Sequence, residues 1–251
     1  MNFIDHVGTE WMSGVEAVAC DMNSDFQEAF EERFDWIRPV FDYFHIDQNF
    51  NDKVVNEVRK DEQRRLYEEG NAEATRALKK PCYILMSNRS TLQKKDEDVA
   101  SERIIHKGSP LFKTEDIKRK SGYEEKYDAL LRKNKLLFTL DLIKEKLSAA
   151  YAMTDEAQMA DAISDIMDIC KATGNKHLLW FGKLLDSHFV GIIAYATYKI
   201  SAGKIEGINQ KIQTLRRHGY GYPDDEYFFL KIMDMSRKPY VRNQPSHKIL
   251  D

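Results

Sequence analysis

Residues 15–45 read VEAVACDMNSDFQEAFEERFDWIRPVFDYFH, and this stretch decides the fold class. A short apolar run, 15–20, ends at Asp21, and a second, 37–41, leads into Asp42 and His45. Short apolar runs with polar boundaries are typical of buried strands. Ser24 suits the start of a helix over 25–34 between the two runs. The stretch therefore predicts a strand–helix–strand unit with Asp21 at the carboxyl end of its first strand.

Most of the remaining chain is predicted to be helical. A long polar helix follows His45, because Phe50, Val54 and Val58 recur at four-residue steps. The other expected elements are a helix over 3–12, a short strand over 81–86, a loop segment with one short helix over 87–122, three helices marked by apolar residues at 136–147, 159–169 and 178–192, and a disordered tail over 239–251.

A second informative stretch, residues 201–222, reads SAGKIEGINQKIQTLRRHGYGY. Apolar residues recur there at three- and four-residue steps, which predicts an amphipathic helix that Gly219 and Gly221 end. Glu206 lies in its first turn, at the positive end of the helix dipole. The periodicity by itself is equally explained if Glu206 is an ordinary surface residue of this helix.

Residue patterns at fixed spacing, in both stretches and shortly after the first one, resemble those of the ISL-three family of bacterial insertion-sequence transposases. They are V-x-x-V-x-x-D-M over 15–22, D-x-F-H over 42–45, V-x-x-V-R over 55–59, and Ser201, Gly203, Ile205, Glu206, Gly207, Asn209 and Tyr220-Gly221-Tyr222. This family belongs to the DDE class, which cuts and joins DNA with metal ions held by three carboxylates.

The resemblance implies a role for each matching residue. Glu206 is the third carboxylate and Asp21 the second, so these two are expected to hold Mg²⁺ or Mn²⁺. Asp42 and His45 are an accessory pair that shapes the catalytic site. A rival assignment makes Asp42 the second carboxylate and Asp21 structural.

The resemblance also implies a fold class: α/β, mostly helical, with a partial ribonuclease-H-like core and a large helical insertion. We expect residues 1–60 to form the first part of this core, 61–200 the insertion, 201–238 the helices that carry Glu206, and 239–251 the tail. The strand that carries the first aspartate in such a core is not recognised before Asp21. The chain is therefore expected to be a truncated copy that binds metal weakly and does not cleave DNA alone.

Basic side chains of the Glu206 helix are the candidates for DNA contact, and a solvated helix face is the other interpretation. They are Lys204, Lys211, Arg216 and Arg217. By resemblance the expected partners are DNA at transposon ends and either a second copy or a full-length transposase. The alternative function is a non-catalytic fragment that associates with full-length transposase and inhibits it.

Composition adds further limits. The 251 residues carry a net charge of −3, whereas DNA-reading domains are usually basic. The three cysteines lack C-x-x-C spacing, which argues against a zinc site and fits a reducing cytoplasm. No apolar run is long enough to span a membrane.

Overall fold

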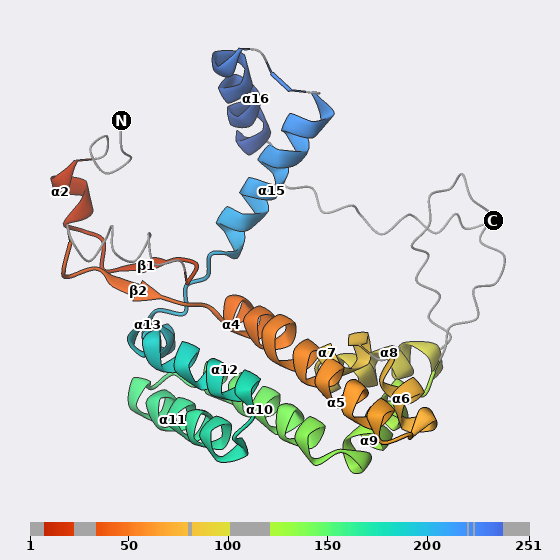
Figure 1. The fold of residues 1–251 in the computed structure, drawn as a ribbon. Coiled ribbons are helices and arrows are strands. Elements are labelled where there is room, and N and C mark those ends of the chain that lie inside the picture. The colour runs from red at the N-terminus through yellow and green to blue at the C-terminus, as the bar shows by residue number, and fades with distance from the viewer. Residues whose placement is uncertain are drawn as a thin grey trace. The chain divides into compact units, whose positions relative to one another are not determined.

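The computed structural model describes residues 8–22, 34–79, 82–100, 121–219, 221–222 and 224–237. It divides the chain into two compact units, unit 1 (Met1–Ser201) and unit 2 (Ala202–Asp251). Unit 1 holds a two-stranded sheet and a helical bundle, and unit 2 holds a pair of helices (Figure 1). No helix in the described parts of the chain is long and apolar enough to cross a membrane.

The two predicted strands of unit 1 are confirmed. β1 (Ala17–Ala19) pairs in parallel with β2 (Arg38–Val40), with Ala17 opposite Arg38 and Ala19 opposite Val40. Parallel neighbours need a crossover connection. The helix predicted over 25–34 lies largely outside the described residues. Before β1, the helix expected over 3–12 is observed as α2 (Thr9–Met12), and residues 1–7 are likewise not described.

The long helix predicted after His45 is confirmed as a continuous run of three segments. These are α4 (Tyr43–Asn49), the π-helical segment η1 (Phe50–Val55) and α5 (Asn56–Glu68). The wider π turn directs neighbouring residues toward the core, and Phe50, Val54 and Val55 are all buried. The boundary expected at residue 60 falls inside α5.

The remaining helices of unit 1 build its core around this long helix. They are α6 (Ala72–Lys79), α7 (Cys82–Met86), α8 (Arg89–Ala100), α9 (Tyr123–Lys133), α10 (Lys135–Ala152), α11 (Glu156–Thr173), α12 (Lys176–Ser187), α13 (Phe189–Ile193) and α14 (Tyr195–Tyr198). The helices α10, α11 and α12 pack in chain order, and α10 and α12 also contact the long helix (Figure 1). Leu140, Ile163 and Phe181 lie in the shared core.

Two sequence predictions in this region need correction. The strand expected over 81–86 is wrong, because Cys82–Met86 forms α7, which packs against α5 and α9. A six-residue apolar run does not distinguish a strand from a buried helix segment. The segment 87–122, predicted as loop with one short helix, contains the helix α8 of twelve residues, and its residues 101–120 are not described. The helix marked over 178–192 is divided at His188 into α12 and α13.

The described part of unit 2 contains the helices α15 (Gly203–His218) and α16 (Asp225–Arg237). Its connection depends on Gly219, where an added Cβ would lie 2.6 Å from the Tyr222 ring. Tyr222 in turn stacks on Phe228 of α16, with ring centroids 5.0 Å apart. Glycine at 219 therefore lets this aromatic turn close against the end of α15.

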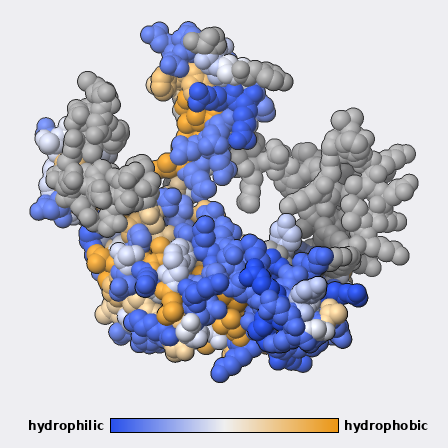
Figure 2. Space-filling view, viewed as in Figure 1, coloured by the Kyte–Doolittle hydropathy of each residue, from blue (hydrophilic) through white to orange (hydrophobic). Residues whose placement is uncertain are grey.

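Apolar side chains of both helices of unit 2 reach its surface beside hydrophilic ones (Figure 2). The exposed aliphatic and phenyl side chains among them are Ile205, Ile208, Phe229, Leu230 and Met233. Ile205 and Ile208 belong to the apolar stripe predicted from the sequence, so the pair of helices does not bury this stripe by itself.

Candidate active site

The parallel strands place two aspartates at equivalent positions. Asp21 follows the last residue of β1 by two positions, and Asp42 follows the last residue of β2 by two. Since the last residues, Ala19 and Val40, are register partners, both aspartates lie at the same edge of the sheet. Carboxyl ends of parallel strands are where α/β folds commonly bind ligands.

Asp42 is buried, and its carboxylate forms hydrogen bonds with two segments that are far apart in the sequence. One oxygen, Oδ1, accepts a hydrogen bond from the His45 backbone N–H at 3.3 Å and so caps the start of α4. The other, Oδ2, accepts a hydrogen bond from the Ser201 hydroxyl at 2.9 Å. The residue as a whole is 4 % exposed. Its two oxygens therefore already stabilise the local fold.

Asp21 differs from Asp42 in its exposure, because 63 % of its side chain is accessible to solvent. Its Oδ1 accepts a hydrogen bond from the Met22 backbone N–H at 2.7 Å and lies 3.5 Å from His45 Nδ1. The His45 ring is mostly buried, at 15 % exposed, so its position relative to Asp21 is fixed by packing. Asp21 is thus a carboxylate open to a ligand.

Cys20 lies directly before Asp21 but is unsuited to nucleophilic chemistry. Burial raises the pKa of its thiol to about 11, against a smaller lowering by the hydrogen bond with Val40. The thiol therefore stays protonated at neutral pH, and protonated thiols are poor nucleophiles.

A tight approach between β2 and α13 positions Phe41, the residue before Asp42. The Phe41 backbone N–H donates to the Gly191 carbonyl at 3.0 Å. A Cβ added at Gly191 would lie 2.4 Å from the Phe41 ring. On the other side, the Tyr151 hydroxyl donates to the Phe41 carbonyl at 3.2 Å. Burial and the nearby charge of Asp42 raise the pKa of Tyr151, so it remains a neutral donor.

The segment that leads toward α15 is also tied to unit 1. Lys199 adopts a left-handed conformation, with φ of 49°, and its Nζ donates to the Tyr151 carbonyl at 3.0 Å and to the Met153 carbonyl. Arg38 of β2 forms a two-pronged ion pair with Glu156 at 2.8 and 3.0 Å. These contacts hold the chain from β2 to Ser201 as one piece.

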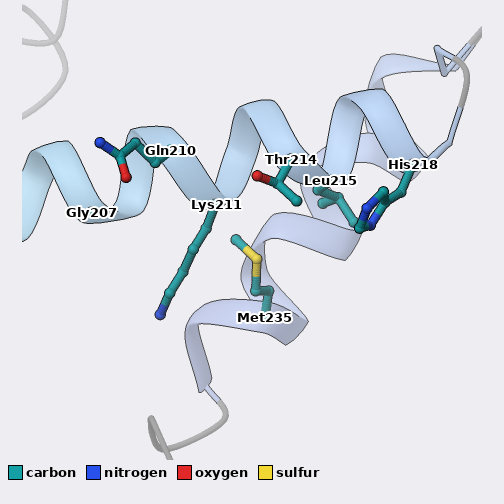
Figure 3. A pocket seen from close by; sticks show the side chains of 7 residues that line it. All are labelled: Gly207, Gln210, Lys211, Thr214, Leu215, His218 and Met235. Carbon is teal, nitrogen blue, oxygen red and sulfur yellow. The ribbon is translucent and has the colours of Figure 1, made fainter. Parts of the chain in front are cut away.

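Glu206 lies in the first turn of α15 and is half-buried. Three of the four predicted DNA-binding residues, Lys211, Arg216 and Arg217, are exposed on the same helix, and the Lys204 side chain lies outside the described part. A cavity of about 470 Å³ opens between α15 and α16 (Figure 3). It is lined by Gly207, Gln210, Lys211, Thr214, Leu215, His218 and Met235.

The structure thus brings together Asp21, Asp42 and His45 within unit 1, and Glu206 with the basic residues within unit 2. The separation of Asp21 from Glu206 stays a prediction, because the two units are each described by themselves. Within the described residues, no three His, Cys, Asp or Glu side chains form a group able to hold a metal ion. Ser201 was missed as a partner of Asp42, although its place at the head of the Glu206 stretch was a signal.

Comparison with known proteins identifies the family. The family model for ISL3-type transposases of the DDE class, described as "Transposase", matches residues 1–232. The chain belongs to this transposase family. The match includes the strand ends that carry Asp21 and Asp42 and the helix that carries Glu206.

A transposase for the insertion sequence element IS1001, from Bordetella parapertussis, is 25 % identical over 218 residues. The match covers 87 % of this chain and 47 % of that protein. The chain therefore spans about half the length of this curated relative. No solved structure matches the chain significantly.

Proposed function

We propose that this member of the ISL3 transposase family carries part of a DDE catalytic centre for DNA strand cleavage and transfer, in which Asp21 and Glu206 hold divalent metal ions. The observation that carries the proposal is the exposed Asp21 carboxylate at the carboxyl end of β1, beside His45 and level with Asp42 on the parallel neighbour. The strand pair, the helical insertion and the helix with Glu206 fit a partial ribonuclease-H-like core.

The residues present fit a hard divalent cation. Mg²⁺ prefers carboxylate and water oxygens, and it keeps several waters when few protein ligands are available. Asp21, at 63 % exposed, can take such a partly hydrated ion without desolvation of a buried group. Asp42, buried and hydrogen-bonded through both oxygens, is the poorer ligand. This contrast supports Asp21 over Asp42 as the second carboxylate.

Chain connectivity supports a role for Glu206 at the same centre. Ser201 is hydrogen-bonded to Asp42, and α15 begins at Gly203. Five residue steps lead from Ser201 to Glu206, three of them within α15, so their Cα atoms lie at most about 12 Å apart. This short connection is compatible with the proposed place of Glu206 near the strand ends.

In this centre the residues of the chain have separate tasks. Asp21 and Glu206 bind, His45 fixes the orientation of the Asp21 carboxylate, and Asp42 holds His45 and Ser201 in place. Bound divalent ions in such centres activate the attacking hydroxyl and stabilise the leaving oxygen. Lys211, Arg216 and Arg217 of α15 are exposed, and in this proposal they contact phosphates of the bound DNA.

Iron-directed backbone cleavage tests the proposal. Fe²⁺ takes the place of Mg²⁺, and ascorbate with peroxide then cuts the chain close to the bound ion. We expect cuts near both Asp21 and Glu206, suppressed by excess Mg²⁺ and lost in Asp21→Asn and in Glu206→Gln. The matched controls are Asp35→Asn, an exposed aspartate before β2, and Glu226→Gln on α16. Cuts that persist in both site variants, or that fall elsewhere, would refute the assignment.

A further inference from the structure

We infer that the hydrogen bond between Ser201 and Asp42 positions Glu206 for catalysis, which makes Ser201 a positioning residue of the transposase. This inference rests on the proposed function of Glu206 and Asp21. In this inference, Asp42 does not bind metal. It connects residues 15–45 with residues 201–222 through its hydrogen bond to Ser201.

The geometry around Asp42 gives the reason. One carboxylate group holds the backbone N–H of His45, whose ring faces Asp21, and at the same time the hydroxyl of Ser201. One buried side chain thus binds both His45, the residue beside Asp21, and Ser201, the last residue of unit 1. The link joins residues 159 positions apart in the sequence.

The surrounding contacts direct Ser201 to this place. Lys199, two residues earlier, is fixed by the carbonyls of Tyr151 and Met153 at the end of α10. Tyr151 itself donates to the carbonyl of Phe41, the residue before Asp42. Both partners of the Ser201–Asp42 bond are therefore held by one network, and Ser201 is the last residue of unit 1 before the chain enters unit 2.

Substitutions at Asp42 separate a positioning role from metal binding. In Asp42→Asn the amide oxygen still caps α4, since asparagine is a good N-cap residue, and the Ser201 hydroxyl can rotate to accept from the amide N–H. Asp42→Ala removes both links. A metal ligand would instead lose its function in both variants, because an amide does not replace a carboxylate charge at Mg²⁺.

The first test measures the distance between the units without any metal. Spin labels are attached at Lys183→Cys and Gln213→Cys, both exposed, with Cys82→Ser to remove a native thiol. We expect a narrow distance distribution in the parent, in Ser201→Thr and in Asp42→Asn. Because a hydrogen bond to a charged group changes an equilibrium by about tenfold or more, Ser201→Ala and Asp42→Ala should broaden it. A distribution that Ser201→Ala leaves unchanged would overturn the inference.

The second test links the hydrogen bond to the site. In Ser201→Ala the iron-directed cut near Glu206 should fall by about tenfold relative to the cut near Asp21, and Ser201→Thr should restore it. A loss of overall stability would lower both cuts together, and threonine would restore neither. If the parent chain shows no cut at either residue, the proposed function fails; if it shows both and Ser201→Ala keeps their ratio, only this inference fails.

Discussion

The close approach of Gly191 to Phe41 makes Gly191→Ala the most informative stability variant. The added Cβ would lie 2.4 and 2.5 Å from two carbons of the Phe41 ring and 3.2 Å from the Pro39 carbonyl oxygen. Phe41 is 1 % exposed and packs edge-on against His188, so its ring has no open space to move into. The backbone of β2 must shift instead.

Overpacking of a filled core costs typically about 1–3 kcal/mol, and we expect about 2 kcal/mol here. For a unit of this size, that loss lowers the melting temperature by about 4–8 °C. Circular dichroism during thermal unfolding measures the change. Because β2 leads directly into Asp42, the iron-directed cut near Asp21 should weaken in the same variant.

A double-mutant cycle identifies the cause. Phe41→Leu replaces the ring with a smaller side chain that leaves room for the new Cβ. The double variant Gly191→Ala/Phe41→Leu should therefore lose less unfolding free energy than the two single variants lose in total, by about 0.5–3 kcal/mol. Gly207→Ala is the control, because no atom lies within 4 Å of its Cβ position and alanine should stabilise α15 by about 1 kcal/mol. An unchanged melting temperature in Gly191→Ala would refute the reasoning.

Three further changes test other parts of the fold. Burial lowers the pKa of Lys144 to about 8, so above that pH the unfolded chain binds more protons than the folded chain, and the free energy of unfolding rises with pH. In urea unfolding, the free energy of unfolding of the parent, relative to that of Lys144→Met, should rise by roughly 1 kcal/mol between pH 7 and 9. A rise on lowering the pH would contradict this sign. Gly219→Ala should displace the Tyr222 ring, 2.6 Å from the new Cβ, and reduce the near-ultraviolet circular dichroism of unit 2, whereas an unchanged spectrum would show that the ring adapts. Asp155→Ala removes the N-cap that accepts from Gln158 N–H at 2.8 Å, and it should cost about 1 kcal/mol in unfolding free energy, while Asp155→Ser should retain most of it.

Local sequence patterns predicted most of the elements that surround the candidate site. The strands before Asp21 and Asp42 were recognised because apolar runs and their polar boundaries are local properties of the sequence. The helix of Glu206, with its end at Gly219, was predicted for the same reason.

Local sequence patterns did not predict the contacts between residues that are distant in the sequence. The helix over Cys82–Met86 was predicted as a strand, since its conformation depends on packing against α5 and α9. The hydrogen bond of Ser201 with Asp42 and the approach of Gly191 to Phe41 join residues more than 140 positions apart in the chain. No periodicity encodes contacts of this kind, which follow from the tertiary fold.

The central claim is that Asp21 and Glu206 hold the same divalent ion or pair of ions. Anomalous diffraction from crystals grown with Mn²⁺ measures this directly. We expect an anomalous peak within about 2.5 Å of carboxylate oxygens of both residues, as for direct coordination, with Asp42 hydrogen-bonded to Ser201 outside the coordination shell. Carboxylates of Asp21 and Glu206 more than roughly 12 Å apart, beyond the reach of a two-metal site, would contradict it.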